Sequence, residues 1–487
     1  MTSVQNHRLL LSGSKIFLIG LIFFSMTSCA LFKKAETNDK VYQTGDELDE
    51  IQGKVVFNPQ TGEYEKVNSI LGKLDTIRWV DKPKSIYPPI TSASKFDDFT
   101  LDDPQNASNS RESIMKTDYE VTYVLPFLSN KYNPSTDKIN KNSNWALQYY
   151  AGARLAFEQL NAEGINLNVH VFDSEASTNK VNELIATSQA LQNSDLIIGP
   201  YKRKNITLLA DFAKKNNITM VSPHSAGMNL TTENFNYIQV NPSLKAHCQA
   251  ITENALKHFT YDQIVLCVRN KPEEIQRLSY FQDALHEITG NDSIRFKQHI
   301  ITDNTADFSQ IDVLPQLFED KTTVFIVPSW SNKTFIYSLL RNLSVARAQN
   351  NFNIAVYGMP QWMRYDDMDF DFYENFSLRI SSSFYIDEMN ANTQNFKRNY
   401  FDRFHTIPSK SAYLGYDETL FFGKMLQKYG TKFQNEISKN EYKSLFSMYK
   451  IKPVIKKTDL GVEIEQFENK FLYILKYENF YFQNDDL

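Results

Sequence analysis

The chain has 487 residues, enough for two or three domains at roughly 100 to 200 residues each. Hydrophobic residues make up 42% of the chain and charged residues 22%, which excludes a wholly disordered or collagen-like protein. The 52 Lys and Arg residues face 57 Asp and Glu residues, giving a formal charge of −5 at pH 7. No positive excess exists to neutralise nucleic-acid phosphates, so nucleic acid is excluded as a partner.

The N-terminus carries the signals of export. Arg8 and Lys15 precede the apolar run 16–24, which is too short to cross about 30 Å of hydrocarbon but fits the core of a signal peptide. Small residues then lead to Cys29 and resemble a bacterial lipobox, with Met26 where that motif usually has Leu. We expect residues 1–28 to be removed and Cys29 to be lipidated. The alternative is ordinary cleavage close to Cys29.

The segment 29–117 is polar and predicts a largely disordered tether. It has an acidic cluster at 46–50 and a stretch rich in Ser, Asn and Asp from 97 to 110. Such a composition buries too little apolar area to offset the entropy of ordering the chain. Residues 55–64 differ, because a turn signal there separates short apolar pieces and predicts a small hairpin, and residues 74–80 alternate like a docked strand.

From residue 118 onward, strand and helix signals alternate. The strands have continuous apolar runs, which are typical of a parallel sheet covered by helices on both faces. A first lobe of about 118–240 is predicted from strands 119–126, 167–172, 195–199, 218–222 and 235–240, and from helices 146–160, 180–191 and 206–215.

The same pattern restarts and predicts a second lobe of about 241–380. Its helices are expected at 244–258, 273–288, 311–318 and 333–347, and its strands at 264–268, 294–300, 323–327 and 354–357. The remaining chain predicts a return strand at 378–386, helices at 395–404 and 414–427, and a hairpin formed by 461–467 and 470–477. The fold class is therefore α/β, with two doubly wound parallel-sheet lobes following a signal peptide and a polar tether.

Two cysteines remain beyond Cys29. Cys248 lies in a predicted helix and Cys267 in a predicted strand. A disulfide would persist after export, but the apolar surroundings favour two small buried hydrophobic side chains.

An ordered set of segments resembles the type I periplasmic-binding-protein superfamily. In order and spacing the set is similar to branched-chain amino-acid binding proteins and to the lipoprotein activator of penicillin-binding proteins. It consists of residues 150–164, 171–174, 197–200, 218–226 and 415–420. The resemblance covers about 118–487 and implies two lobes with a ligand site between them.

The resemblance also suggests which residues bind the ligand. In such folds ligands lie outside the carboxyl ends of the strands, where helix N-termini offer free N–H groups. In the amino-acid binders, the loop that matches 222–226 holds the ligand carboxylate, which nominates Ser222, His224 and Ser225. Alternatively, the two serines cap the next turn and His224 is a solvated loop residue.

Further candidates lie at other strand ends. Tyr201 and Trp330 would stack on a ligand or interlock the lobes, and Arg269 would bind a ligand or pair with a carboxylate of the protein itself. The pair 416–417 is expected to fix a helix start rather than to contact ligand.

The second lobe departs from the amino-acid binders. These use an acidic side chain there to receive the ligand ammonium, but residues 358–362 contain no acid. Recognition of a zwitterion would therefore need Asp366 or Asp417 to reach the site, because an unpaired buried ammonium is costly.

Catalytic signatures are missing from the sequence. The 8 histidines do not pair at metal-ligand spacing, and there is no nucleophile elbow, Cys-x-x-Cys or phosphate loop. We therefore expect neither an enzyme nor a bound metal or cofactor.

Two functions remain open. One is a lipoprotein that binds a small polar solute, such as an amino acid or peptide, and delivers it to an ABC permease. The other is an envelope scaffold that contacts a peptidoglycan synthase through the same fold. Either would be anchored in the cell envelope by its lipid, by default on the periplasmic face of the outer membrane.

Overall fold

The computed structural model describes residues 55–58, 63–66 and 112–485, except 136–138, 304, 366–367 and 459–460. The chain divides into two compact units, 1–92 and 93–487. In the first unit, β1 (Val55–Asn58) and β2 (Glu63–Lys66) pair antiparallel, so the small hairpin predicted at 55–64 is confirmed. The strand expected at 74–80 and the lipidation site Cys29 lie outside the described residues.

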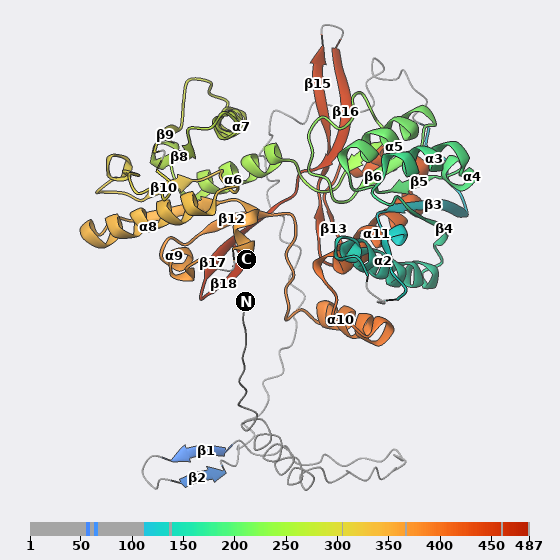
Figure 1. Ribbon diagram of the computed structural model, residues 1–487, viewed down its shortest axis with the longest axis horizontal. Helices are drawn as coiled ribbons and strands as arrows, with labels where there is room; N and C mark the ends of the chain where they lie inside the picture. The colour runs from blue at the N-terminus through green and yellow to red at the C-terminus, as the bar shows by residue number, and fades with distance from the viewer. Residues whose placement is uncertain are drawn as a thin grey trace, which may run out of the picture. The chain divides into compact units, whose positions relative to one another are not determined.

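The first lobe of the second unit is built on a seven-stranded sheet in the order β15-β16-β7-β6-β5-β3-β4 (Figure 1). Its strands are β3 (Asp118–Leu125), β4 (Asn166–Asp173), β5 (Leu196–Ile198), β6 (Thr219–Ser222), β7 (Tyr237–Gln239), β15 (Ile451–Thr458) and β16 (Gly461–Asn469). All neighbours pair parallel except β15 with β16.

Helices cover both faces of this sheet. They are α2 (Asn144–Ala162), α3 (Thr178–Thr187), α4 (Gln189–Gln192), α5 (Arg203–Lys215), α10 (Ala391–Phe404), α11 (Lys410–Tyr429) and α12 (Gln434–Ile437). The core on one face takes residues from α2 and α11, and the core on the other from α3 and α5. The doubly wound fold predicted from the apolar runs is confirmed.

Helices α2 and α11 touch at their backbones. A Cβ on Gly152 of α2 would lie 1.9 Å from the carbonyl oxygen of Ala412, and a Cβ on Gly415 of α11 would lie 1.9 Å from that of Tyr149. Only glycine allows so close an approach. Gly152 and Gly415 therefore let α2 and α11 lie in backbone contact.

The second lobe has a seven-stranded sheet in the order β18-β17-β12-β11-β10-β8-β9. Its strands are β8 (Ile264–Arg269), β9 (Lys297–Ile301), β10 (Thr323–Ile326), β11 (Ile354–Gly358), β12 (Arg379–Ser382), β17 (Tyr473–Glu478) and β18 (Tyr481–Asn484). The first five run parallel, and β17 and β18 add an antiparallel edge.

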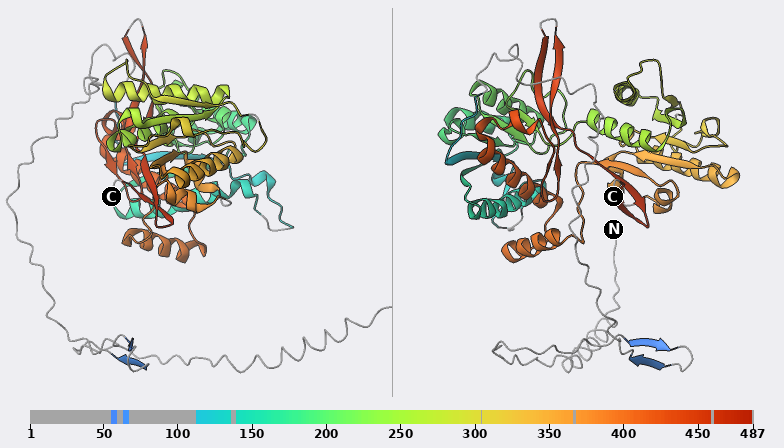
Figure 2. Two further views of the ribbon diagram at one scale, coloured as in Figure 1. Left: turned by 90° about the vertical axis from the view of Figure 1, so that its left-hand side faces the viewer. Right: turned by 180° about the vertical axis from the view of Figure 1, so that it is seen from behind.

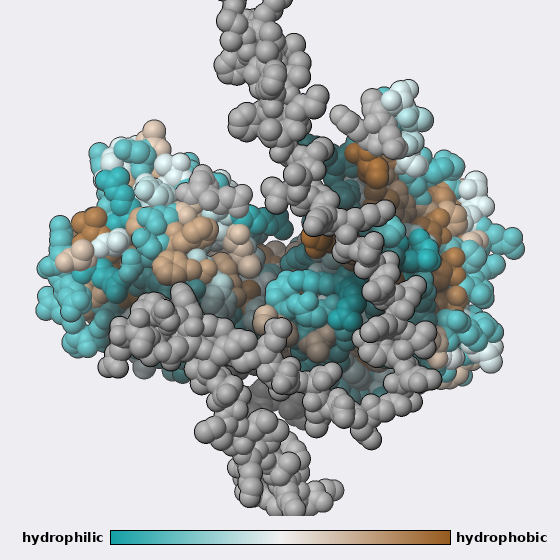
Figure 3. Space-filling model, turned by 90° about the horizontal axis from the view of Figure 1, so that it is seen from below, coloured by the Kyte–Doolittle hydropathy of each residue, from teal (hydrophilic) through white to brown (hydrophobic). Residues whose placement is uncertain are grey.

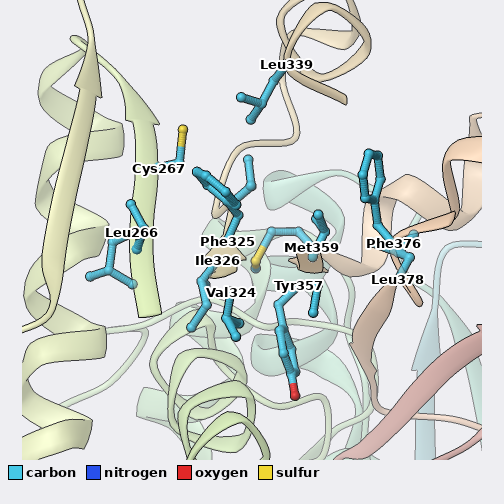
Figure 4. Close-up of a cluster of buried hydrophobic side chains, with 14 of the residues drawn as sticks. Leu266, Cys267, Val324, Phe325, Ile326, Leu339, Tyr357, Met359, Phe376 and Leu378 are labelled. Atoms are coloured by element: carbon cyan, nitrogen blue, oxygen red, sulfur yellow. The ribbon is translucent and has the colours of Figure 1, made fainter. Parts of the chain in front are cut away.

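The helices of the second lobe pack as two pairs, α6 with α7 and α8 with α9. Their bounds are α6 (Leu244–His258), α7 (Pro272–Thr289), α8 (Lys333–Asn350) and α9 (Phe370–Asn375). The core contains Cys267, labelled in Figure 4, and also Cys248; both are free and buried, as expected for small hydrophobic side chains.

Short 3₁₀ turns complete the described elements. They are η2 (Ser129–Lys131), η3 (Lys141–Ser143), η4 (Tyr261–Gln263), η5 (Leu314–Gln316), η6 (Pro360–Arg364) and η7 (Gly430–Lys432), and two short strands β13 (Tyr442–Lys443) and β14 (Met448–Tyr449) pair apart from the large sheets.

The predicted C-terminal hairpin is wrong. Strand β16 joins the sheet of the first lobe and pairs with β15, whereas β17 joins the sheet of the second lobe (Figure 2). The chain passes from one sheet to the other at residues 470–472. Strand pairing between distant segments overrode the local turn signal at Glu468 and Asn469.

Two helix predictions were also wrong. The helix expected at 311–318 is only the turn η5, because Pro315 lacks an N–H and blocks a longer helix. The helix expected at 180–191 is divided at Ser188, which is extended and accepts a hydrogen bond from the Leu191 N–H at 3.2 Å. Ser188 therefore starts a new helix instead of continuing the old one.

Candidate functional site

The carboxyl ends of the strands in the first lobe bring aromatic side chains together. The His224 ring lies 4.1 Å from that of Trp145 and 5.9 Å from that of Tyr149, and Tyr201 lies 5.2 Å from Trp145, measured between centroids. We call these four residues the aromatic corner. It joins the first turns of α2 to the loops after β5 and β6.

His224 is held in a neutral form. Its ring is half-buried, and burial, together with the positive charge of Lys410, lowers its pKa to about 4. Its carbonyl oxygen accepts a hydrogen bond from the Asn241 side chain at 2.9 Å. At neutral pH the imidazole is therefore uncharged and offers one donor and one acceptor.

The two nominated serines differ. Ser225 is half-buried, and its hydroxyl accepts a hydrogen bond from the Gly227 N–H at 3.2 Å, so it caps its turn as the alternative interpretation expected. Ser222 ends β6 and is completely buried, with its hydroxyl beside that of Tyr237. Neither the Ser222 hydroxyl nor the Tyr237 hydroxyl has a well-aligned hydrogen-bond partner among the described residues. Ligand contact by either serine stays a prediction.

Tyr201 is the exposed member of the corner, with 48% of its side chain accessible. It follows a cis peptide bond between Gly199 and Pro200. Its ring contacts Trp145 of the same lobe. Ligand contact by Tyr201 stays a prediction.

Positive charge lies beside the aromatic corner. Lys410 is the first residue of α11, and its ammonium lies 5.1 Å from the centre of the Phe384 ring. The side chain is accessible, yet the surrounding protein and the charge of Arg364 lower its pKa to about 8. Burial lowers the pKa of His247 to about 4, and the charge of Lys410 adds to this effect; the His247 imidazole shares a 2.7 Å hydrogen bond with Ser381. This charge favours an anionic ligand group.

In the second lobe, Arg269 pairs with a carboxylate of the protein itself. Its Nε donates to Oε1 of Glu274 at 3.0 Å, and its guanidinium also donates to the Ser331 hydroxyl at 3.0 Å. Glu274 is completely buried and accepts a further hydrogen bond from Ser329 at 2.5 Å. The ion pair neutralises much of the charge that a ligand would need from Arg269.

Trp330 likewise contacts its own lobe. The Arg277 guanidinium lies 3.6 Å from the centre of the indole ring, in cation–π geometry. The Trp330 carbonyl oxygen accepts a hydrogen bond from the Tyr365 hydroxyl at 2.5 Å. The half-buried indole is thereby held at the carboxyl end of β10, where ligand contact stays a prediction.

Asp417 does not supply the acid that zwitterion recognition requires. It lies inside α11, completely buried, and accepts hydrogen bonds from the N–H groups of Leu445 and Phe446 at 2.8 and 3.1 Å. The expectation that residues 416–417 fix a helix start was also wrong, because α11 begins at Lys410. Asp366 lies outside the described residues.

Sequence reasoning missed Trp145 and Lys410. Each lies in the first turn of its helix, far along the chain from the loop 222–226. Trp145 is one of 4 tryptophans and follows the first strand of the lobe, which was the available signal. No sequence signal pointed to Lys410, because its position near His224 depends on the packing of α11 against α2.

Some site types are not found among the described residues. The described part of the chain holds no cluster of His, Cys, Asp and Glu suited to a metal ion. Within the same residues, the helices are too short or too polar to cross a membrane.

Comparisons with known proteins agree with the architecture. Residues 148–468 match the model of the receptor family ligand binding region. A putative branched-chain amino acid ABC transporter protein from Rhodospirillum rubrum has a similar structure, with TM-score 0.54, 12% identity and coverage of 75% of this chain and 99% of that one.

Two further solved structures are similar. A periplasmic ligand-binding protein of a branched-chain amino acid ABC transporter from Burkholderia xenovorans gives TM-score 0.50 at 12% identity, covering 75% of this chain and 94% of that one. LpoA from Haemophilus influenzae gives TM-score 0.49 at 11% identity, covering 77% of this chain and 59% of that one. No curated protein sequence matches significantly.

These identities show the fold alone. The family match spans most of the chain, from within α2 to β16, and includes strands of both sheets. The chain belongs to the receptor family of ligand-binding regions, and its two lobes have the type I periplasmic-binding-protein fold.

Proposed function

We propose that this protein is an envelope lipoprotein, anchored through Cys29, that binds a small polar solute at the carboxyl ends of its strands. The observation that carries the proposal is the aromatic corner, in which the ring of a neutral His224 packs at a tilt against that of Trp145 beside the charge of Lys410. In this role the protein would deliver its ligand to an ABC permease. The amino-acid transporters among similar structures support the class of ligand.

The corner suits a carboxylate-bearing ligand. Lys410 supplies positive charge, and the His224 imidazole can donate a hydrogen bond without a second charge. Tyr201 and Trp145 provide apolar ring faces for the body of the ligand. Because Asp417 is committed to internal hydrogen bonds, the proposal does not rely on a ligand ammonium.

The first experiment is a thermal-shift screen of the chain without residues 1–28. Amino acids, dicarboxylates and short peptides are the probes, and calorimetry measures the affinity of any hit. Tyr201→Ala should weaken binding by about 10-fold through loss of an accessible ring contact. The matched control is Tyr261→Ala, which removes a similarly exposed tyrosine from the second lobe. Equal affinity of both variants would contradict the proposed site.

A second variant separates the two interpretations of Ser225. If the residue only caps its turn, Ser225→Ala should lower stability by about 1 kcal/mol and leave affinity unchanged. If its hydroxyl also contacts the ligand, affinity should fall by roughly 10-fold. Failure of every probe to bind would instead favour the envelope scaffold that contacts a peptidoglycan synthase.

The anchor has its own test. Cys29→Ala should abolish lipid attachment and leave an unprocessed or soluble precursor in detergent partition. Cys248→Ala is the control, because that thiol is buried in the second lobe. Unchanged partition of the Cys29 variant would contradict the anchor.

A further inference from the structure

A pocket of about 630 Å³ opens on the first lobe between α2, α10 and α11, away from the aromatic corner. Its volume lies in the range of roughly 300 to 1,000 Å³ that is usual for small-ligand sites. We call it the α10 pocket. Helix α10 is the lowest labelled helix in Figure 1, and hydrophilic residues are prominent on this lobe when it is seen from below (Figure 3).

One wall of the α10 pocket is a row of asparagines. Asn392, Asn395 and Asn399 lie three and four residues apart on α10, so their side chains share one face of the helix. All three are exposed, and among the described residues none of their side-chain amides has a hydrogen-bond partner. The row therefore offers several free donors and acceptors along the pocket.

The asparagines do not serve the stability of the helix. Asn is a weak helix former, and each one inside an exposed helix costs roughly 0.5 kcal/mol relative to Ala. The aromatic packing of α10 against the lobe comes from other residues, above all Phe396, whose ring lies 4.7 Å from that of Tyr413 and 4.9 Å from that of Tyr416. The cost points to a use of the amides in binding.

The remaining lining combines charge and apolar surface. Glu158 and Arg403 form an ion pair at 3.5 Å, and Asp402 adds a carboxylate with no ion-pair partner among the described residues. Leu155 and Leu445 contribute half-buried apolar side chains. The net charge of the lining is negative, which disfavours phosphate and carboxylate ligands.

We propose that the α10 pocket binds a neutral saccharide. Amides and carboxylates are the groups that satisfy the donor and acceptor pairs of neighbouring sugar hydroxyls. The half-buried side chains of Leu155 and Leu445 receive the apolar C–H face of a sugar ring. A peptide fits less well, since the pocket presents helix side chains and no free strand edge for backbone pairing. The site is independent of the solute site proposed above.

The test uses chitohexaose, cellohexaose and maltohexaose as soluble probes, measured by calorimetry on the chain without residues 1–28. Insoluble chitin and cellulose are tested in parallel by co-sedimentation. The variant replaces Asn392, Asn395 and Asn399 together by Ala, which raises helix propensity and so keeps α10 folded. The control is Asn161→Ala, an exposed asparagine on α2 outside the pocket.

Binding of one of these saccharides that weakens at least 10-fold in the triple variant, but not in Asn161→Ala, is the expected result. Binding of the soluble hexamers would identify the ligand of the α10 pocket as a free oligosaccharide. Binding of the insoluble polymers alone would identify it as the surface of a polysaccharide. Tyr201→Ala should leave this binding unchanged. The proposal is overturned if no saccharide binds in either form, if the triple variant binds as wild type does, or if short peptides bind there instead.

Discussion

The His224 ring packs against the Trp145 ring, with their centroids 4.1 Å apart, and this contact joins the loop after β6 to the start of α2. Both belong to the first lobe, so the corner exists without the second lobe. Lys410, at the start of α11, lowers the pKa of His224 further. The corner and the charge beside it thus combine the start of α2, the loops after β5 and β6, and the start of α11, which lie far apart in the sequence.

The pKa of His224 predicts a loss of stability in acid. The imidazole titrates at about 4 in the folded protein, against about 6.5 when unfolded, so unfolding takes up a proton in between. The stabilisation is complete above pH 6.5 and is lost as the pH falls to 4, by about 2 to 3 kcal/mol. The unfolding free energy, measured with urea, should fall less steeply from pH 6.5 to pH 4 in His224→Asn than in wild type.

The control for that series is His405→Asn. His405 is exposed at the end of α10, and its φ of 54° is a conformation that Asn accepts. The unfolding free energy of this variant should fall with decreasing pH as steeply as that of wild type. A His224→Asn variant that kept the full acid sensitivity would show that another group is responsible.

Glu418 predicts the opposite behaviour at higher pH. Burial raises the pKa of this carboxyl group to about 8, and the Tyr149 hydroxyl donates to it at 2.6 Å. Its contribution is fully present below pH 4.5 and is lost as the pH rises through 8. Relative to wild type, Glu418→Gln should therefore gain at least about 2 kcal/mol of unfolding free energy between pH 5 and pH 8.

Chemical denaturation at both pH values provides the measurement. Gln has nearly the shape of the protonated acid and keeps an acceptor for Tyr149, so the variant should still fold. Parallel pH profiles for wild type and Glu418→Gln would mean that the carboxyl titrates normally.

The contact between α2 and α11 predicts that glycine there is required. Gly152→Ala would place a methyl group 1.9 Å from the Ala412 carbonyl oxygen, inside a backbone contact that cannot move aside. We expect a loss of about 3 kcal/mol or more, even though Ala is the better helix former by about 1 kcal/mol. Denaturation curves would compare Gly152→Ala, where a steric clash opposes the gain in helix propensity, with the surface variant Asn161→Ala, where only helix propensity changes. A Gly152→Ala variant more stable than wild type would refute the contact.

The ion pair of Arg269 with Glu274 predicts a stability effect in the second lobe. Arg269→Met would leave the buried Glu274 carboxylate without its cation, at a cost of about 3 kcal/mol. Affinity for any solute found by the screen should change less than 3-fold. Arg341→Met, at an exposed position of α8, is the comparison for stability. Intact stability with strongly weakened binding would instead assign Arg269 to the ligand.

The sequence by itself determined the α/β architecture. Continuous apolar strands such as 264–268 and helical spacing such as 244–258 are local signals, and α6 begins and ends as predicted. The family resemblance nominated the loop 222–226, and of its three candidate residues His224 lies in the aromatic corner. Local patterns succeed where hydrophobic period and chain connectivity alone decide the structure.

Only the tertiary structure decided which distant segments meet. Strands β16 and β17 are separated by three residues, yet they pair in different sheets, because their partners β15 and β12 lie elsewhere in the chain. In the same way, helix packing brought Trp145 and Lys410 to His224, while Arg269 was taken up by Glu274. Such pairings depend on burial and on charge neutralisation between groups remote in sequence, and no local pattern encodes them.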